Sequence, residues 1–132
     1  MTTKPMAQVV HHADLELLDR KVTRDGGALR YLEGGQYGLV TSIFESEVVP
    51  GSGPLTHSHP YAELFIVHEG TGRFVVDNQA MNVHPGDIVI VPPNAWHAFT
   101  NPGPSMLRHT AIHQAPAFSQ TSHPDHEREP DR

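Results

Sequence analysis

Residues 56–63, with the sequence THSHPYAE, place two histidines and a carboxylate within seven positions. In a β-strand, side chains two residues apart point to the same side, so His57 and His59 would project together. Glu63 has the same parity, although we expect Pro60 to bend the chain between them. Two imidazoles and a carboxylate that converge in this way suit divalent transition metals. The segment indicates a metal site, and the alternative is a chance cluster in a chain with 11 histidines.

A fourth ligand would have to come from another part of the chain, and PPNAWHAFTN at residues 92–101 supplies a candidate. His97 follows a Pro-Pro-Asn turn signal and enters a segment with an apolar face. If this segment is a strand beside the first one, a third imidazole joins the other ligands.

The elements that would position these side chains are short β-strands. Segments rich in β-branched and aromatic residues alternate with Gly, Pro, Asn and Asp about every eight to twelve positions, which is typical of an all-β sandwich or barrel. The predicted strands lie within 28–32, 37–49, 64–67, 73–76, 88–91, 96–100 and 106–113. At 132 residues the chain is long enough for one domain with its own core.

Taken together, the two histidine segments resemble the signature motifs of the cupin superfamily. The first motif matches at Gly51, His57, His59, Glu63 and Gly70, and the second at Gly86, Pro92, His97 and Asn101. One glycine of the second motif is replaced by Asn94, the residue that best tolerates a left-handed turn after glycine. The resemblance implies a small single-domain cupin, with a jelly-roll barrel (a double-stranded β-helix) and a metal ion on His57, His59, Glu63 and His97.

The chain divides into three parts on this interpretation. We expect an N-terminal arm, partly β, over residues 1–24 and the cupin barrel over 25–114. The remainder, 115–132, is polar and rich in proline and charge, which predicts a mobile tail.

The resemblance also implies a function, without fixing the reaction. We expect an enzyme that acts on a small organic molecule with one divalent transition metal per chain: iron, nickel, manganese, copper or zinc. An O2-activating dioxygenase similar to the quercetinases is the first hypothesis, with Glu63 as both ligand and catalytic proton carrier. A non-redox isomerase, lyase or cyclase is the alternative, and a protein that only binds an acid or sugar is a further one.

Aromatic residues near the motifs are candidates for a pocket. Phe65 shares the parity of Glu63, Phe99 shares that of His97, and Trp96 lies beside it, whereas Phe74 is better explained as core. His109 and His113 share one face of the last strand. If that face points inward, His109 could assist the metal ligands as a hydrogen-bond donor or a proton shuttle.

Composition excludes several other classes. A formal charge of −6 argues against nucleic acid as a partner, and the absence of cysteine excludes disulfides and thiolate sites. No signal-like start or apolar run of about 20 residues is found, so we expect a cytoplasmic protein without a membrane partner. The runs around Leu64 and Ile88 are apolar at consecutive positions, which predicts that the N-terminal strand or a second copy, as in a homodimer, covers the barrel's outer side.

Overall fold

The computed structural model describes residues 6–18 and 27–125, and in these ranges the protein is built from β-strands and two short 3-10 turns. The turns are η1 (His12–Asp14) and η2 (Gly34–Tyr37). The strands are β1 (Glu16–Leu17), β2 (Ala28–Leu32), β3 (Ser42–Val48), β4 (His57–Ser58), β5 (Glu63–Glu69), β6 (Gly72–Val76), β7 (Gln79–Val83), β8 (Ile88–Val91), β9 (His97–Thr100), β10 (Leu107–His113) and β11 (Thr121–Ser122). The described part of the chain contains no helix long and apolar enough to cross a bilayer. The predicted all-β class is confirmed.

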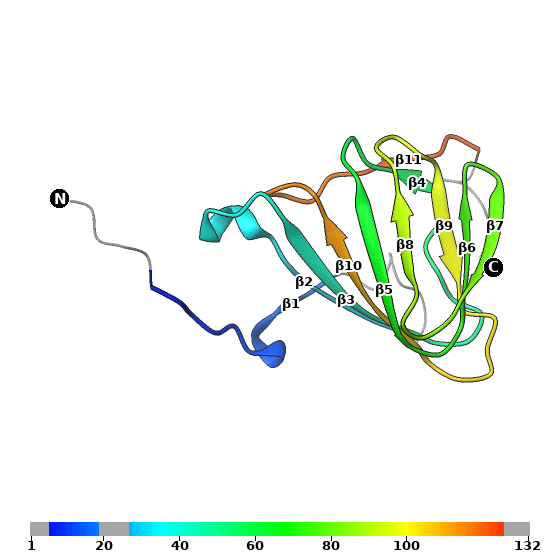
Figure 1. The fold of residues 1–132 in the computed structure, drawn as a ribbon, viewed down its shortest axis with the longest axis horizontal. Coiled ribbons are helices and arrows are strands. Elements are labelled where there is room, and N and C mark those ends of the chain that lie inside the picture. The colour runs from blue at the N-terminus through cyan, green and yellow to red at the C-terminus, as the bar shows by residue number, and fades with distance from the viewer. Residues whose placement is uncertain (1–5, 19–26, 126–132) are drawn as a thin grey trace.

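The strands form two antiparallel sheets that face each other as a jelly-roll sandwich (Figure 1). One sheet has the order β1-β2-β3-β10-β5-β8, and the other has the order β11-β4-β9-β6-β7. Strands distant in the sequence are therefore neighbours: β10 lies between β3 and β5, and β9 between β4 and β6.

The core lies between the sheets and follows the two-residue period of the strands. Along β3 and β10 every second residue is buried, and the alternate ones are partly or fully exposed. Phe44 and Leu107 are inward residues of these strands, while Phe65 and Phe74 come from β5 and β6 and pack with ring centroids 4.9 Å apart. The interior thus joins both sheets into one core.

The turn at Asp77-Asn78 is a hairpin, although the sequence indicated only the end of a strand. Both residues have positive φ, 46° and 67°, which fits the tight connection between β6 and β7. Residues 79–83, which follow it, are strand β7 and were not predicted, because QAMNV has little β-branched or aromatic character.

The outer side of β5 and β8 is apolar. Leu64 pairs with Ile90, and Ile66 with Ile88, and the two isoleucines of β8 are 68% and 60% exposed. The N-terminal strand was one predicted cover for this side, but that prediction is wrong for the described part: β1 pairs with β2 at the opposite edge of the sheet.

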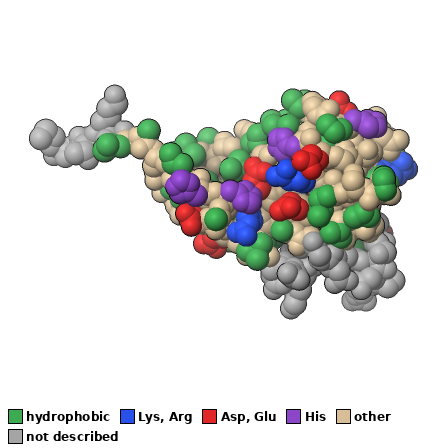
Figure 2. Space-filling model, turned by 90° about the horizontal axis from the view of Figure 1, so that it is seen from below, with side chains coloured by type: hydrophobic (Ala, Val, Ile, Leu, Met, Phe, Trp, Pro, Cys, Tyr) green, Lys and Arg blue, Asp and Glu red, His purple; other side chains and the backbone are tan. Residues whose placement is uncertain are grey.

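The outer surface also carries charged side chains of both signs. Figure 2 shows acidic, basic and histidine side chains gathered near the middle of one face, with hydrophobic side chains around them. On the outer side of the larger sheet, Arg108 pairs with Glu69 at 3.2 Å, and His68 lies 2.7 Å from the hydroxyl of Thr110. Interleaved charges of this kind form a solvated surface and no one-sign patch on that face.

The segment after β10 differs from the predicted mobile tail as far as Asp125. Phe118 packs against Phe44 with ring centroids 5.0 Å apart, and β11 pairs with β4 through Thr121 and Ser122. Ring contacts and hydrogen bonds from side chains of the barrel, such as Ser42 to the carbonyl of Ala115 and the N–H of Phe118 to Glu33, also hold this polar segment, and composition does not reveal them. The rest of the predicted tail, residues 126–132, lies outside the described residues, as do 1–5 and 19–24 of the predicted arm.

Candidate metal centre

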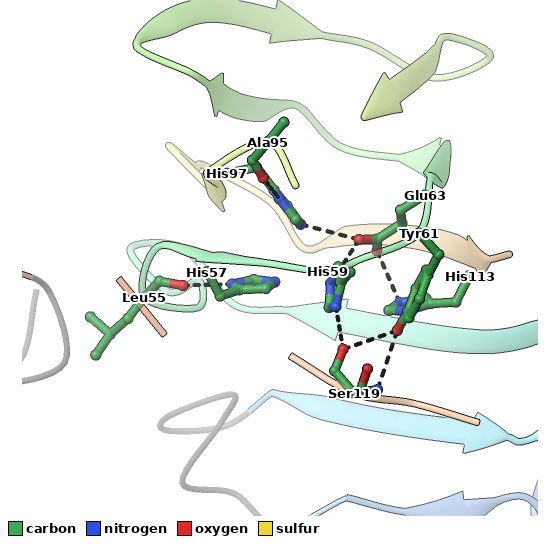
Figure 3. Close-up of polar contacts among 9 residues, drawn as sticks. All are labelled: Leu55, His57, His59, Tyr61, Glu63, Ala95, His97, His113 and Ser119. Atoms are coloured by element: carbon green, nitrogen blue, oxygen red, sulfur yellow. Dashed lines mark hydrogen bonds and ion pairs between the residues drawn. The ribbon is translucent and has the colours of Figure 1, made fainter. Parts of the chain in front are cut away.

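Five ionisable side chains meet at one end of the barrel, and both sheets contribute to them (Figure 3). The first sheet supplies Glu63 at the start of β5 and its cross-strand partner His113 at the end of β10. The other supplies His57 on β4, its cross-strand partner His97 on β9, and His59 just after β4. All five are buried, and we call them the histidine–glutamate cluster.

Glu63 is the centre of the cluster. Its Oε1 lies 3.1 Å from Nε2 of His59 and 3.1 Å from Nε2 of His97. Its Oε2 lies 3.1 Å from Nε2 of His113. The ring of His57 stands 4.4 Å, between centroids, from that of His97. The cluster contains two groups that can hold a metal ion, the three histidines 57, 59 and 97, and the trio of His59, Glu63 and His113.

In three of these rings, a backbone carbonyl determines which ring nitrogen carries the hydrogen. Nδ1 of His57 lies 2.7 Å from the carbonyl oxygen of Leu55, Nδ1 of His59 2.6 Å from that of Ser119, and Nδ1 of His97 2.9 Å from that of Ala95. A carbonyl oxygen only accepts, so each Nδ1 carries the hydrogen and donates it. In the neutral ring, Nε2 then presents a lone pair, the arrangement typical of metal-bound histidine.

This arrangement requires a positive charge at the point where the lone pairs meet. Burial alone would raise the pKa of Glu63, but the ring nitrogens of His113, His59 and His97 outweigh it and hold that pKa well below its usual range. Without a metal ion, a ring that already carries hydrogen on Nδ1 must take a second proton on Nε2 to donate it to the carboxylate, and a metal cation would take the place of that proton. Burial, with repulsion from His97, lowers the pKa of His57 to about 4, which disfavours a proton there.

The residues present therefore fit a divalent transition metal. Two ligand atoms that each lie about 2.1 Å from an ion, at right angles, are about 3 Å apart. The separations of 3.1 Å around Glu63 Oε1 match this value. Nε2 of His59 is also fully buried, beside Oε1 of Glu63, where a ligand atom would lie.

A hydrogen-bonded chain extends from the other oxygen of Glu63. His113 faces Oε2 through Nε2, and its Nδ1 lies 2.7 Å from the hydroxyl of Tyr61. The backbone N–H of Ser119 donates to the same hydroxyl at 3.3 Å. Burial raises the pKa of Tyr61 to about 12, so its hydroxyl keeps its proton and donates it to the carbonyl oxygen of Ser119 at 3.1 Å. The hydroxyl oxygen can then accept a hydrogen bond from Nδ1 of His113. The sequence offered His109 for this assisting role, whereas the structure puts His113 in contact with Glu63.

An apolar cavity opens beside the cluster. Phe65, Phe99 and His109, three of the predicted pocket residues, line it. Trp96, the fourth, lies just before β9 and does not line this cavity: its ring packs on His123, with centroids 4.6 Å apart. Phe74 is fully buried in the core behind Phe65 and Phe99.

Two asparagines of the second motif shape the loops around the cluster. Asn94 adopts φ 67°, the left-handed conformation in which it replaces glycine, and its N–H donates to the carbonyl of His59 at 2.7 Å. The buried side chain of Asn101 donates to the carbonyls of Val48 and Ser105 at 2.7 and 2.8 Å. These bonds hold the chain on either side of His97.

Comparison with known families supplies the identification. The family described as the cupin domain matches residues 44–113, more than half of the chain and all five members of the histidine–glutamate cluster. The chain belongs to the cupin family. An uncharacterized protein of Methanocaldococcus jannaschii is 34% identical to this cupin over 85 residues, which are 62% of this chain and 68% of that protein.

Solved structures of other cupins share the fold. Oxalate decarboxylase of Lactobacillus farciminis, in its formate complex, has a TM-score of 0.75 at 22% identity over 85% of this chain, which spans only 34% of that enzyme. A cupin-like protein of Thermotoga maritima has a TM-score of 0.70 at 24% identity, covering 80% of this chain and 82% of that one. The polyketide cyclase RemF of Streptomyces resistomycificus has a TM-score of 0.68 at 21% identity, covering 82% and 79%. At these identities the likeness shows the fold alone.

Proposed function

We propose that this cupin is a metal-dependent enzyme that acts on a small organic molecule, with one divalent transition metal on His57, His59, Glu63 and His97. The observation that carries the proposal is the convergence of three carbonyl-oriented imidazoles, two of which lie 3.1 Å from an ionised, buried carboxylate. Iron, nickel, manganese, copper and zinc all accept this set of nitrogen and oxygen ligands.

The ion would supply a Lewis acid with open positions for substrate and, where it is redox-active, for O2. Glu63 would present one oxygen to the metal and keep the other against His113. A proton taken from substrate by Glu63 could then be shared with His113, whose far nitrogen is held by Tyr61. In this role Glu63 is both a ligand and the catalytic acid–base.

An O2-dependent dioxygenase, similar in kind to the quercetinases, is the first reaction that we propose. A non-redox isomerase, lyase or cyclase is the second, because the chain from Glu63 through His113 to Tyr61 suits proton transfer and needs no O2. In the third, the pocket captures an acid or sugar and does not convert it.

Oxygen uptake separates these proposals. The protein is loaded with each of the five metals in turn and supplied with a panel of phenols and diketones. Consumption of O2 with an iron-, nickel-, manganese- or copper-loaded sample supports the dioxygenase, and product without O2 supports the non-redox enzyme. Ligand binding without product under any condition contradicts an enzyme.

Glu63→Gln tests the catalytic role. The amide keeps the shape but cannot carry the proton, so we expect turnover to fall at least about 100-fold. Metal content is measured on the same sample, and the exposed Glu69→Gln serves as the matched control. Full activity in Glu63→Gln would reduce Glu63 to a ligand.

We also propose that two copies associate through the apolar outer side of β5 and β8. Ile88 and Ile90 are exposed there beside Leu64 and Ile66, and contiguous exposed apolar surface is typical of an interface. In a homodimer, the partner copy would cover the apolar outer side of the barrel, as the sequence predicts. A cytoplasmic location stays a prediction.

A further inference from the structure

The outer side of the larger sheet carries more apolar surface than β5 and β8 alone. Side chains of directly paired residues lie on the same side of a sheet. The pairing therefore aligns outward aliphatic side chains of five strands in one row: Leu32, Ile43, Ile112, Leu64 and Ile90. Ile66 and Ile88 extend this row along β5 and β8. We call these seven residues the aliphatic stripe, and its β8 end is the most exposed part.

The size of the aliphatic stripe limits what it can bind alone. Neighbouring strands lie about 4.8 Å apart and alternate residues of a strand about 7 Å apart, so the stripe covers about 20 by 10 Å. Stable dimers bury about 800 Å² on each partner, which is severalfold more. If two copies associate through this side of the barrel, as proposed above, additional surface has to join the interface.

Residues 6–10, with the sequence MAQVV, offer such a surface, and we call them the MAQVV segment. Met6 is 86% exposed, Val9 79% and Val10 39%. The segment leads through η1 into β1, which pairs with β2 at the edge of the sheet opposite β8, and it runs away from both sheets (Figure 1). His12 lines a polar hollow with outward side chains of β2, β3 and β10. The chain therefore leaves the barrel above the same side that carries the aliphatic stripe.

Symmetry determines where this segment meets a second copy. Homodimers usually have a two-fold axis. When the stripes of two copies face each other about an axis parallel to the strands, the strand order reverses, and β2 of one copy lies opposite β8 of the other. An axis across the strands would oppose β2 to β2, and the chains that stand above this edge would hold the sheets apart. The first arrangement places each projecting segment against the exposed β8 end of the partner's stripe.

We propose that the MAQVV segment of each copy packs against β8 of its partner and covers Ile88 and Ile90. The homodimer is then held by an exchange of N-terminal segments as well as by the aliphatic stripe, and this inference rests on the homodimer proposed above. Residues 6–11, ahead of η1, span about 17 Å when extended, which exceeds the distance of about 10 Å between packed sheets. The segment is therefore long enough to reach the partner.

Cross-linking tests the exchange directly. The chain contains no cysteine, so a single introduced thiol reports on one position. Val9→Cys protein is mixed with size-tagged Ile90→Cys protein, the subunits are allowed to exchange, and a short bis-maleimide is added. We expect a heterodimer linked between positions 9 and 90, and none when Val40→Cys replaces Val9→Cys, because Val40 is similarly exposed but lies outside the segment. Ile112→Cys, on the middle strand of the stripe, should link to the same position of the partner.

Sedimentation measures how much the segment contributes to association. Val9→Lys combined with Val10→Lys removes two apolar side chains from each copy, and we expect the dissociation constant of the dimer to rise at least about 100-fold. Gln8→Lys combined with His11→Lys adds charge to the same stretch and keeps the valines. In this control the rise should stay below about tenfold.

Each failure has a distinct meaning. A monomeric wild type overturns the proposed homodimer itself. A dimer without the link between positions 9 and 90, or with unchanged affinity in Val9→Lys combined with Val10→Lys, overturns the exchange alone. Ile90→Cys protein that links to its own copy overturns the axis parallel to the strands. A chain with both Val9→Cys and Ile90→Cys that links only within itself assigns the segment to its own sheet, which also overturns the exchange.

Discussion

His57, His59 and His97 are each oriented by a hydrogen bond to the main chain. Each ring donates Nδ1–H to a carbonyl oxygen, from Leu55, Ser119 and Ala95 respectively. Hydrogen bonds of this kind fix the ring and raise the basicity of the opposite nitrogen. The proposed ligand atoms are therefore preorganised by loop geometry, and Glu63 would complete the set from the facing sheet.

His109 should make the metal-free protein sensitive to acid. Its pKa is about 4 when folded and about 6.5 when unfolded, so the unfolded chain takes up the proton first as the pH falls. The stability that depends on a neutral His109 is present above pH 6.5 and is lost as the pH falls towards 4.

Between pH 7 and pH 5 this loss should be about 2 kcal/mol, and His109→Phe should lose correspondingly less. Urea unfolding of both metal-free proteins at the two pH values measures the difference. His57 has the same shift and remains in both proteins, so part of the dependence should persist. An identical loss in the two proteins would contradict the account.

The proposed ligand residues could be singled out from the sequence, because His57, His59, Glu63 and His97 belong to motifs with fixed spacing. Tyr61 and His113 could not, since His113 reaches Glu63 only through the pairing of β10 with β5. When two paired strands are fifty residues apart in the sequence, neither strand carries a local pattern that reveals which residues will face each other.

Among the strands, β2, β5, β8 and β10 are dense in β-branched or large apolar residues, and their sequences indicated them. The two-residue strands β4 and β11 have no such pattern and form because the chain is brought back across the site. A strand could thus be predicted where its side chains are β-branched or large and apolar. It could not be predicted where only backbone pairing defines it.

The segment after β10 closes the side of the cluster and should be required for it. Ser119 supplies the carbonyl that orients His59, and Phe118 packs beside Phe44 and His113. A chain ended after Gln114 loses both contacts. We expect its unfolding free energy to drop by about 2–4 kcal/mol and its metal affinity by at least about tenfold.

A chain ended after Asp125 keeps these contacts and is the control. Chemical unfolding and competition with a metal-binding dye measure the two quantities. Metal binding of wild-type strength in the chain ended after Gln114 would show that the segment does not support the site.

For the whole molecule, the exposed isoleucines of β8 should decide the oligomeric state. A charged side chain at Ile88 and Ile90 would have to be buried in the proposed interface without a partner. We expect the wild type to sediment as a dimer, and Ile88→Lys combined with Ile90→Lys to sediment as a folded monomer.

Leu39→Lys combined with Val40→Lys is the matched control, because these residues are exposed apolar side chains elsewhere on the surface. Analytical ultracentrifugation separates the states. A monomeric wild type would contradict an interface on this side of the barrel. So would a variant with both Ile88→Lys and Ile90→Lys that remains dimeric.

The central claim is that the histidine–glutamate cluster binds one transition metal ion per chain, and elemental analysis of purified, untagged protein tests it most directly. We predict close to one equivalent of metal in the wild type, its loss in His57→Ala, and an unchanged content in His68→Ala, whose histidine is exposed. Absence of stoichiometric metal even after reconstitution, or a His57→Ala variant that binds metal as tightly as the wild type, would contradict the assignment of the site.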